Sequence, residues 1–262
     1  MVTTKAVKST ALITLKGNWA VSCSKAMVPV FATIIILLSC VLLSLPFGDI
    51  LAYMIFALLF TFIVAPLWLG TVRTYWKSAN GELEGVSGCF YYFSGKKEYM
   101  RALKYNLKVL LHWLKVAVIL LVPAILVNVF TNSETYELFG VSIPLFVMNL
   151  RYLDKVFHIA ALILAIAHLI SLYLPAFLFV SIEDMSPNEC FKRGTEIGGY
   201  TKSRFFTHLL GFGGWIILSA TLIPLLFTMP YLLMSYVVEC RYNVAFYNLS
   251  GQAQEQTPVY NV

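Results

Sequence analysis

Charged residues are scarce in this chain of 262 residues, of which only 12% are Asp, Glu, Lys or Arg. Soluble globular domains carry about 25% charged residues, which keep their surfaces hydrated. Here 59% of the residues are hydrophobic, and the mean hydropathy is +0.77. These proportions exclude a soluble globule, a disordered chain, collagen and a coiled coil. They are typical of a polytopic membrane protein.

Enzyme and metal-site motifs are also missing from the sequence. It contains no G-x-S-x-G, H-E-x-x-H, P-loop or dinucleotide signature, and no pair of acidic residues lies in an apolar stretch. The five cysteines are an odd number and form no C-x-x-C, which argues against a disulfide framework and against a zinc site. We therefore expect no enzymatic activity, no metal and no cofactor.

Five uncharged stretches are candidates for membrane spans, because about 20 apolar residues are needed to cross the hydrocarbon core. They cover residues 26–48, 50–72, 116–133, 156–182 and 205–238. Asp49 alone separates the first two, which predicts a tight hairpin turn. The last stretch is too long for one span, and Pro224 and Pro230 are expected to break it into helices at 204–222 and 225–245. The predicted fold class is all-α, with six transmembrane helices in three hairpins.

Lysine and arginine are distributed unevenly between the two sides of this topology. Sixteen of the 19 fall on the side that holds both termini, against two on the other side. Short cytoplasmic loops carry this excess, so both termini are predicted to be cytoplasmic in a multi-pass plasma-membrane protein. The net charge of +6 favours contact with an anionic inner leaflet and argues against nucleic acid as a partner.

Three pseudo-repeat units are predicted, at about residues 1–75, 88–182 and 186–249, followed by a polar tail at 250–262. Each unit starts with a mixed basic and apolar stretch, expected to form a cytoplasmic amphipathic helix before its hairpin. Leu15-Lys16-Gly17-Asn18-Trp19 and Leu103-Lys104-Tyr105-Asn106-Leu107 share an L-K-x-N pattern. The alternative is that any helix entering from a basic loop has this character. A short apolar segment at 140–150 is interpreted as interfacial or re-entrant.

Several short motifs carry a resemblance to a known family. They are Leu15-Lys16-Gly17-Asn18-Trp19, Gly70-Thr71-Val72-Arg73, Cys89-Phe90-Tyr91-Tyr92-Phe93, Ser186-Pro187-Asn188-Glu189-Cys190, Pro230-Tyr231 and Phe246-Tyr247-Asn248-Leu249. Over nearly its whole length, the chain resembles a family of bacterial integral membrane proteins, chiefly Gram-positive, catalogued as domain-of-unknown-function family 975. The resemblance implies a bacterial plasma-membrane protein, and it implies no activity, because none is established for the family.

Ionisable residues inside predicted spans are the candidate ligand-binding residues: His158, His168 and Lys115. The two histidines fall on one face of the predicted fourth span. Lys115 directly precedes the uncharged stretch 116–133, and it lies about 9 Å inside the third span if that span starts near Val109. The alternatives left open are a packing face whose histidines hydrogen-bond to neighbouring helices, and a lysine that reaches back to the headgroups.

Two functions remain open at this stage. The first is a transporter-like or transport-accessory protein that handles a small amphiphile, lipid or peptide. The alternative is a non-transporting membrane scaffold, whose basic amphipathic helices contact lipid headgroups, a protein partner or a second copy of the chain. Residues expected to make such contacts are Lys96, Lys97, Arg101 and Lys104.

Overall fold

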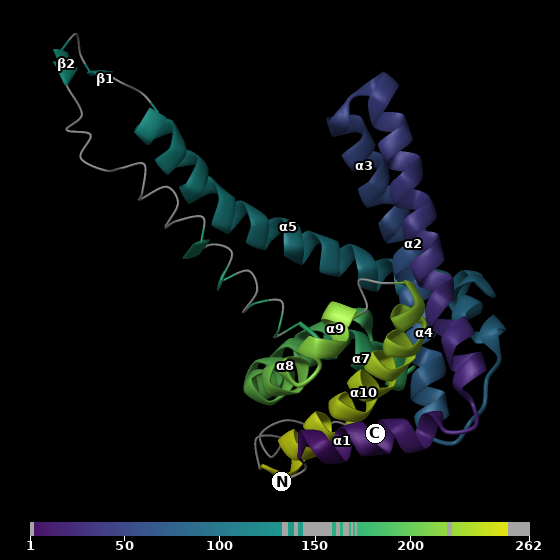
Figure 1. Ribbon diagram of the computed structural model, residues 1–262. Coiled ribbons are helices and arrows are strands. Elements are labelled where there is room, and N and C mark those ends of the chain that lie inside the picture. The colour runs from purple at the N-terminus through teal and green to yellow at the C-terminus, as the bar shows by residue number, and fades with distance from the viewer. Residues whose placement is uncertain are drawn as a thin grey trace. The chain divides into compact units, whose positions relative to one another are not determined.

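Helices dominate the protein, as the predicted all-α class requires (Figure 1). A computed structural model describes residues 3–132, 136–138, 141–143, 159–160, 163–164, 168, 170, 172–218 and 222–250. The strands in this part of the chain are one short antiparallel pair, Tyr136–Leu138 (β1) and Val141–Ile143 (β2). β2 falls at the start of the segment interpreted as re-entrant, and residues 144–150 of that segment lie outside the described residues.

The chain divides into two compact units. The first combines Met1–Lys108 with Ser171–Val262, and the second is Val109–Ile170. This division does not test the three predicted pseudo-repeats or the polar tail, which therefore stay a prediction. The candidate pocket described below lies in the first unit.

The first helix, α1 (Thr4–Leu15), forms at the place expected for an amphipathic helix. The Thr3 side chain caps it by accepting a hydrogen bond from the Ala6 backbone N–H. Val7, Ala11 and Leu15, spaced four residues apart, are buried along one face, and the helix packs against α10 (Leu222–Leu249). Gly17, with φ of 85°, then turns the chain into the next helix.

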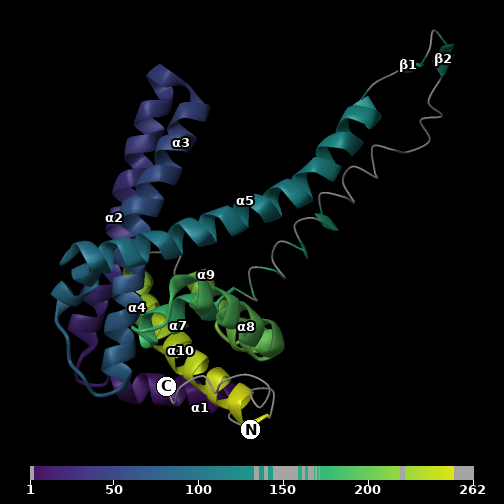
Figure 2. The ribbon, with the colours of Figure 1, turned by 180° about the vertical axis from the view of Figure 1, so that it is seen from behind.

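A long apolar hairpin follows (Figures 1 and 2). It consists of α2 (Trp19–Phe47) and α3 (Asp49–Leu59), and α3 continues through a π-helical turn (Phe60–Val64) into α4 (Ala65–Ala79). Gly48 adopts φ of 81°, which other residues avoid, and makes the predicted tight turn. Trp19–Leu45 and Leu51–Ala79 are the helices, among the described residues, that are long and apolar enough to cross a membrane.

The second cytoplasmic helix and the third span were predicted as separate pieces, but the structure merges them. A 3₁₀ segment at Val86–Phe93 leads into α5, one helix over Lys96–Asn132. Beyond the strands, the first unit resumes with α7 (Leu174–Ser181) and α8 (Pro187–Leu210). Ser186 caps α8 by accepting a hydrogen bond from the Glu189 N–H, as the Ser-Pro sequence predicted.

The predicted helix at 204–222 is wrong. α8 ends at Leu210, and the short helix α9 (Gly213–Leu218) begins after a break. The break contains Gly211, and Gly213 and Gly214 follow it; glycine is a poor helix former because its backbone loses the most freedom on folding. The freed Gly211 carbonyl accepts a hydrogen bond from the Lys8 ammonium of α1.

The expectation that Pro230 breaks a helix is also wrong, because α10 runs through it. Proline has no N–H, so the carbonyl four residues earlier, that of Leu226, loses its helical partner. The Cys23 thiol of α2 donates a hydrogen bond to this carbonyl instead. Pro224 lies in the first turn of α10, where a missing N–H is tolerated. The helix predicted at 225–245 therefore forms.

Arg101 closes the end of α7 rather than standing free at the surface. One guanidinium nitrogen, Nη2, donates to the carbonyls of Phe179, Ile182 and Met185 at 3.1, 2.9 and 3.2 Å. The guanidinium also lies 4.2 Å from the centroid of the Phe179 ring. Of the residues expected to contact lipid headgroups or a partner, Arg101 is thus engaged internally, whereas Lys96, Lys97 and Lys104 are exposed.

Replacing Arg101 by alanine should destabilise the fold by about 2 kcal/mol, because charged hydrogen bonds to carbonyls at a helix end are lost. Arg101→Lys should recover only part of this, since a lysine lacks the planar guanidinium. Reversible unfolding in mixed micelles measures the free energy. The matched control is Lys97→Ala, an exposed basic residue of the same helix, which should change it by less than about 0.5 kcal/mol. Equal effects of both alanine variants would contradict the assignment.

Candidate functional site

The three ligand residues predicted from the sequence have different surroundings in the structure. His158 lies outside the described residues, and Lys115 is exposed on α5. The Nε2 atom of His168 lies 2.7 Å from Nε2 of His112, and the two rings stack with their centroids 4.9 Å apart. The observed hydrogen bond agrees with the packing alternative, in which histidines bond to a neighbouring helix.

The paired imidazoles do not have the geometry of a metal site. Zinc–nitrogen bonds of about 2.0–2.1 Å in a tetrahedral site separate two ligand nitrogens by about 3.3 Å. The observed 2.7 Å is a hydrogen-bond distance. Within the part of the chain that the structure describes, no group of three or more His, Cys, Asp or Glu could hold a metal ion.

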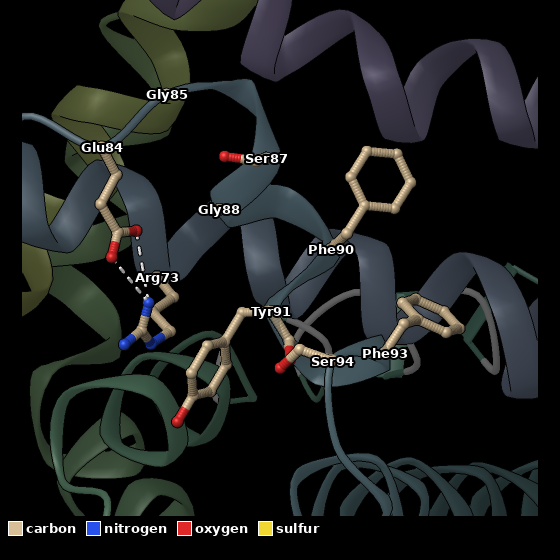
Figure 3. Close-up of a pocket in the computed structure, with 9 residues that line it drawn as sticks. All are labelled: Arg73, Glu84, Gly85, Ser87, Gly88, Phe90, Tyr91, Phe93 and Ser94. Carbon is tan, nitrogen blue, oxygen red and sulfur yellow. Dashed lines mark hydrogen bonds and ion pairs between the residues drawn. The ribbon is translucent and has the colours of Figure 1, made fainter.

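A polar pocket in the first unit has a volume of 420 Å³ and lies where α4 meets the 3₁₀ segment (Figure 3). One side chain comes from α4 and the others from the loop that follows it. The pocket is lined by Arg73, Glu84, Gly85, Ser87, Gly88, Phe90, Tyr91, Phe93 and Ser94. We call it the Arg73 pocket.

Close packing of the 3₁₀ segment on α4 creates the pocket. A Cβ atom on Gly70 of α4 would lie 2.1 Å from the Cys89 carbonyl oxygen, so only glycine allows this approach. Residues three apart share a side of a 3₁₀ helix. Cys89 and Tyr92 accordingly face inward and are buried. Phe90 and Phe93 share another side and are 47% and 41% exposed at the pocket.

A network of ion pairs forms the opposite end of the pocket (Figure 3). Arg73 is only 8% exposed, and its Nη1 donates to both Glu84 oxygens, at 3.0 and 3.2 Å. Its Nη2 lies 3.3 Å from Oε1 of Glu183, and its guanidinium lies 3.6 Å from the centroid of the Tyr91 ring. Lys77 adds a 2.7 Å contact to Glu84. The charges of Arg73 and Glu84 are therefore held in fixed positions.

The electrostatic surroundings hold Glu84 in its ionised form. Burial acts to raise the pKa of the Glu84 carboxyl, but the hydrogen bond from Lys77 and the charge and hydrogen bonds of Arg73 outweigh it, so the pKa lies below its usual value. A carboxylate with a low pKa is a weak general base at neutral pH. Glu84 is thus better suited to accept hydrogen bonds than to abstract protons.

The arrangement gives the Arg73 pocket two chemically different ends. The Arg73–Glu84 pair occupies one side in Figure 3, the Phe90 and Phe93 rings the other, and the hydroxyls of Ser87 and Ser94 lie between them. Sequence reasoning missed this site because it counted Arg73 as a cytoplasmic basic residue and used the 89–93 segment only as a family landmark. Two of the six motifs that carried the resemblance, 70–73 and 89–93, meet here.

Lowering the pH should weaken the first unit through Glu84. Because its folded pKa is depressed, its stabilising contribution is complete above the unfolded pKa, and it is lost as the pH falls through the lower folded value. The thermal unfolding midpoint in detergent should therefore fall less for Glu84→Gln than for the wild type when the pH is lowered. Glu98→Gln on α5 is the control and should follow the wild type. Parallel curves for wild type and Glu84→Gln would contradict this role.

Comparison with protein-family models, with curated proteins and with solved structures finds no match for this chain. The resemblance to the bacterial membrane-protein family thus stays an expectation based on short motifs.

Proposed function

We propose that this protein binds a small amphiphile in the Arg73 pocket, as a transporter-like or transport-accessory protein of the plasma membrane. The observation that carries the proposal is the pocket's division into an ionic end, at Arg73 and Glu84, and an aromatic end, at Phe90 and Phe93. A ligand that complements both ends has a polar headgroup joined to an apolar chain.

The position of the pocket along the chain supports access from the membrane surface. Arg73 lies in the last two turns of an apolar helix long enough to cross a membrane, Leu51–Ala79. Basic residues cluster from Arg73 to Lys108, so the positive-inside rule puts this end at the cytoplasmic face. We propose six spans and cytoplasmic termini on the same basis. An amphiphile could then enter the pocket without leaving the interface.

The pocket's size and charges restrict the ligand further. Small-molecule pockets have volumes of about 300–1,000 Å³, and 420 Å³ accommodates a headgroup with a short length of chain. The Arg73 guanidinium and the Glu84 carboxylate already satisfy each other. A ligand that exchanges these contacts for its own must offer both an acceptor and a donor, as a zwitterionic headgroup does.

Filling the Arg73 pocket should abolish amphiphile binding. Ser94→Trp places a large ring at the exposed rim between the two ends, and it should weaken the binding of a fluorescent, single-chain phosphatidylethanolamine analogue at least tenfold. Ser203→Trp, at an exposed position of α8, is the matched control and should bind like the wild type. The fluorescence titration is made with the full chain in lipid nanodiscs. Unchanged affinity of Ser94→Trp, or no saturable binding by the wild type, would contradict the proposal.

The exposure of Lys96, Lys97 and Lys104 supports a second candidate function, that of a membrane scaffold. Their ammonium groups lie on the first turns of α5, next to the exposed apolar side chains of Met100 and Leu107. An anionic leaflet attracts each such lysine by about 1 kcal/mol. The scaffold function needs no pocket, so variants of these lysines test it independently of amphiphile binding.

Neutralising these three lysines should reduce the retention of anionic lipid. Native mass spectrometry of the triple variant Lys96→Gln, Lys97→Gln and Lys104→Gln should show fewer bound phosphatidylglycerol molecules than the wild type, because the attraction to the leaflet is lost. A single Lys202→Gln variant, on the exposed side of α8, controls for a general effect of charge. Equal retention by the triple variant and wild type would remove the support for this function.

A further inference from the structure

A ladder of polar contacts, partly exposed at its Glu196 end and buried beyond it, joins α8 to α10, away from the Arg73 pocket. Tyr247 donates to Glu196 at 2.8 Å. Asn243 donates at 2.8 Å to the Tyr173 hydroxyl, which itself lies 2.6 Å from the Thr201 hydroxyl. Residue numbers rise along α8 as they fall along α10, so the two helices run antiparallel at these contacts.

The next level of the ladder is an ionisable pair, His208 and Glu239. Their side chains are 3% and 4% exposed, and Nδ1 of His208 lies 3.8 Å from Oε2 of Glu239. Nδ1 has no hydrogen-bond partner among the described residues. The rings of Phe205 and Phe212 flank the imidazole, with centroids 6.5 and 5.1 Å away. A buried pair at this distance is close enough to exchange a proton after a small side-chain movement, and its net charge depends on how many protons it holds.

Further buried polar atoms line the same face of α10. Thr228, Ser235, Glu239 and Asn243 are spaced by seven, four and four residues, which keeps them on one side of a helix. All four are at most 3% exposed. Thr228 Oγ1, Ser235 Oγ and Asn243 Oδ1 have no hydrogen-bond partner in the described part of the protein. Buried polar atoms of this kind are normally satisfied by ordered water.

The charges around the pair favour the state in which Glu239 is ionised and His208 is neutral, so that the pair carries one negative charge. Lys8 of α1 approaches from one side, where its ammonium is bound to the Gly211 carbonyl and lies 4.4 Å from the Phe212 ring centroid. Arg204 of α8 lies over the Phe246 ring at 4.9 Å. The other titratable groups near the pair are Tyr173, the residue before α7, and Cys240 of α10. The two fixed cations balance a negative charge on Glu239, and uptake of one proton brings the pair to neutrality.

We propose that His208 and Glu239 together form a proton-binding site, which protons reach along the polar face of α10. The proton is transferred from bulk water, through ordered water beside Ser235 and Asn243, to the imidazole or to the carboxylate. No other reactant takes part. Ionisable and polar residues inside membrane helices mark ion and proton paths, and α10 contains the predicted sixth span. The site does not depend on the Arg73 pocket or on its ligand.

Protonation can be observed directly by NMR of the full chain in nanodiscs. The chain has four histidines, so the variant His112→Gln, His158→Gln, His168→Gln leaves His208 as the single histidine and keeps the pair intact. With labelled histidine and glutamate, one resonance of this pair should titrate between about pH 4 and pH 9. The Glu239 resonance is identified by its loss in Glu239→Gln.

The effect of Glu239 on the titration of His208 distinguishes a proton-binding site from a purely structural contact. Glu239→Gln should shift the midpoint of the His208 titration by at least about one pH unit, because the pair binds its proton jointly. Glu189→Gln, a partly exposed carboxyl of the same helix as His208, should leave the midpoint unchanged. If neither His208 nor Glu239 titrates in the otherwise native chain, the proposal is wrong. It is equally contradicted if His208 titrates with the same midpoint in Glu239→Gln.

Discussion

The constraint on which the structure depends is that an apolar chain with few charged side chains must satisfy its backbone from within. Wherever a helix ends or is interrupted in apolar surroundings, its carbonyls need a donor. Arg101 supplies three hydrogen bonds at the end of α7. Cys23 bonds the carbonyl that Pro230 leaves without a partner, and Lys8 bonds that of Gly211 at the end of α8. Each of these contacts joins two helices that are far apart in the sequence. The hydrogen bonds that satisfy the backbone therefore also fix how the helices pack.

The Arg73 pocket follows the same principle with charges in place of carbonyls. Arg73 is buried at the end of an apolar helix, and such a cation is tolerated only when it is paired and hydrogen-bonded. Glu84, Glu183 and the Tyr91 ring meet that requirement. The pairing draws the loop after α4 back onto the helix, and the close approach at Gly70 leaves Phe90 and Phe93 outside the contact. A site with one ionic and one aromatic end results from this packing.

The sequence predicts the local parts of this structure better than the contacts between them. The turn at Gly48 and the cap at Ser186 are confirmed because they depend on neighbouring residues only. The break expected at Pro230 is wrong because a thiol from another helix compensates for the missing N–H. The pocket was missed because it depends on how closely two segments approach at Gly70, which no periodicity records. The bond between His112 and His168, 56 residues apart, could not be predicted for the same reason.

Whether the Arg73 pocket holds an amphiphile can be measured by a native mass spectrum of the protein extracted gently from its own membrane. We expect a reproducible adduct with the mass of a small amphiphile on the wild type and its loss from the Ser94→Trp variant. An adduct that survives in Ser94→Trp would place the ligand elsewhere. A wild-type protein without any adduct, but with a co-purifying protein, would contradict the pocket and favour the scaffold.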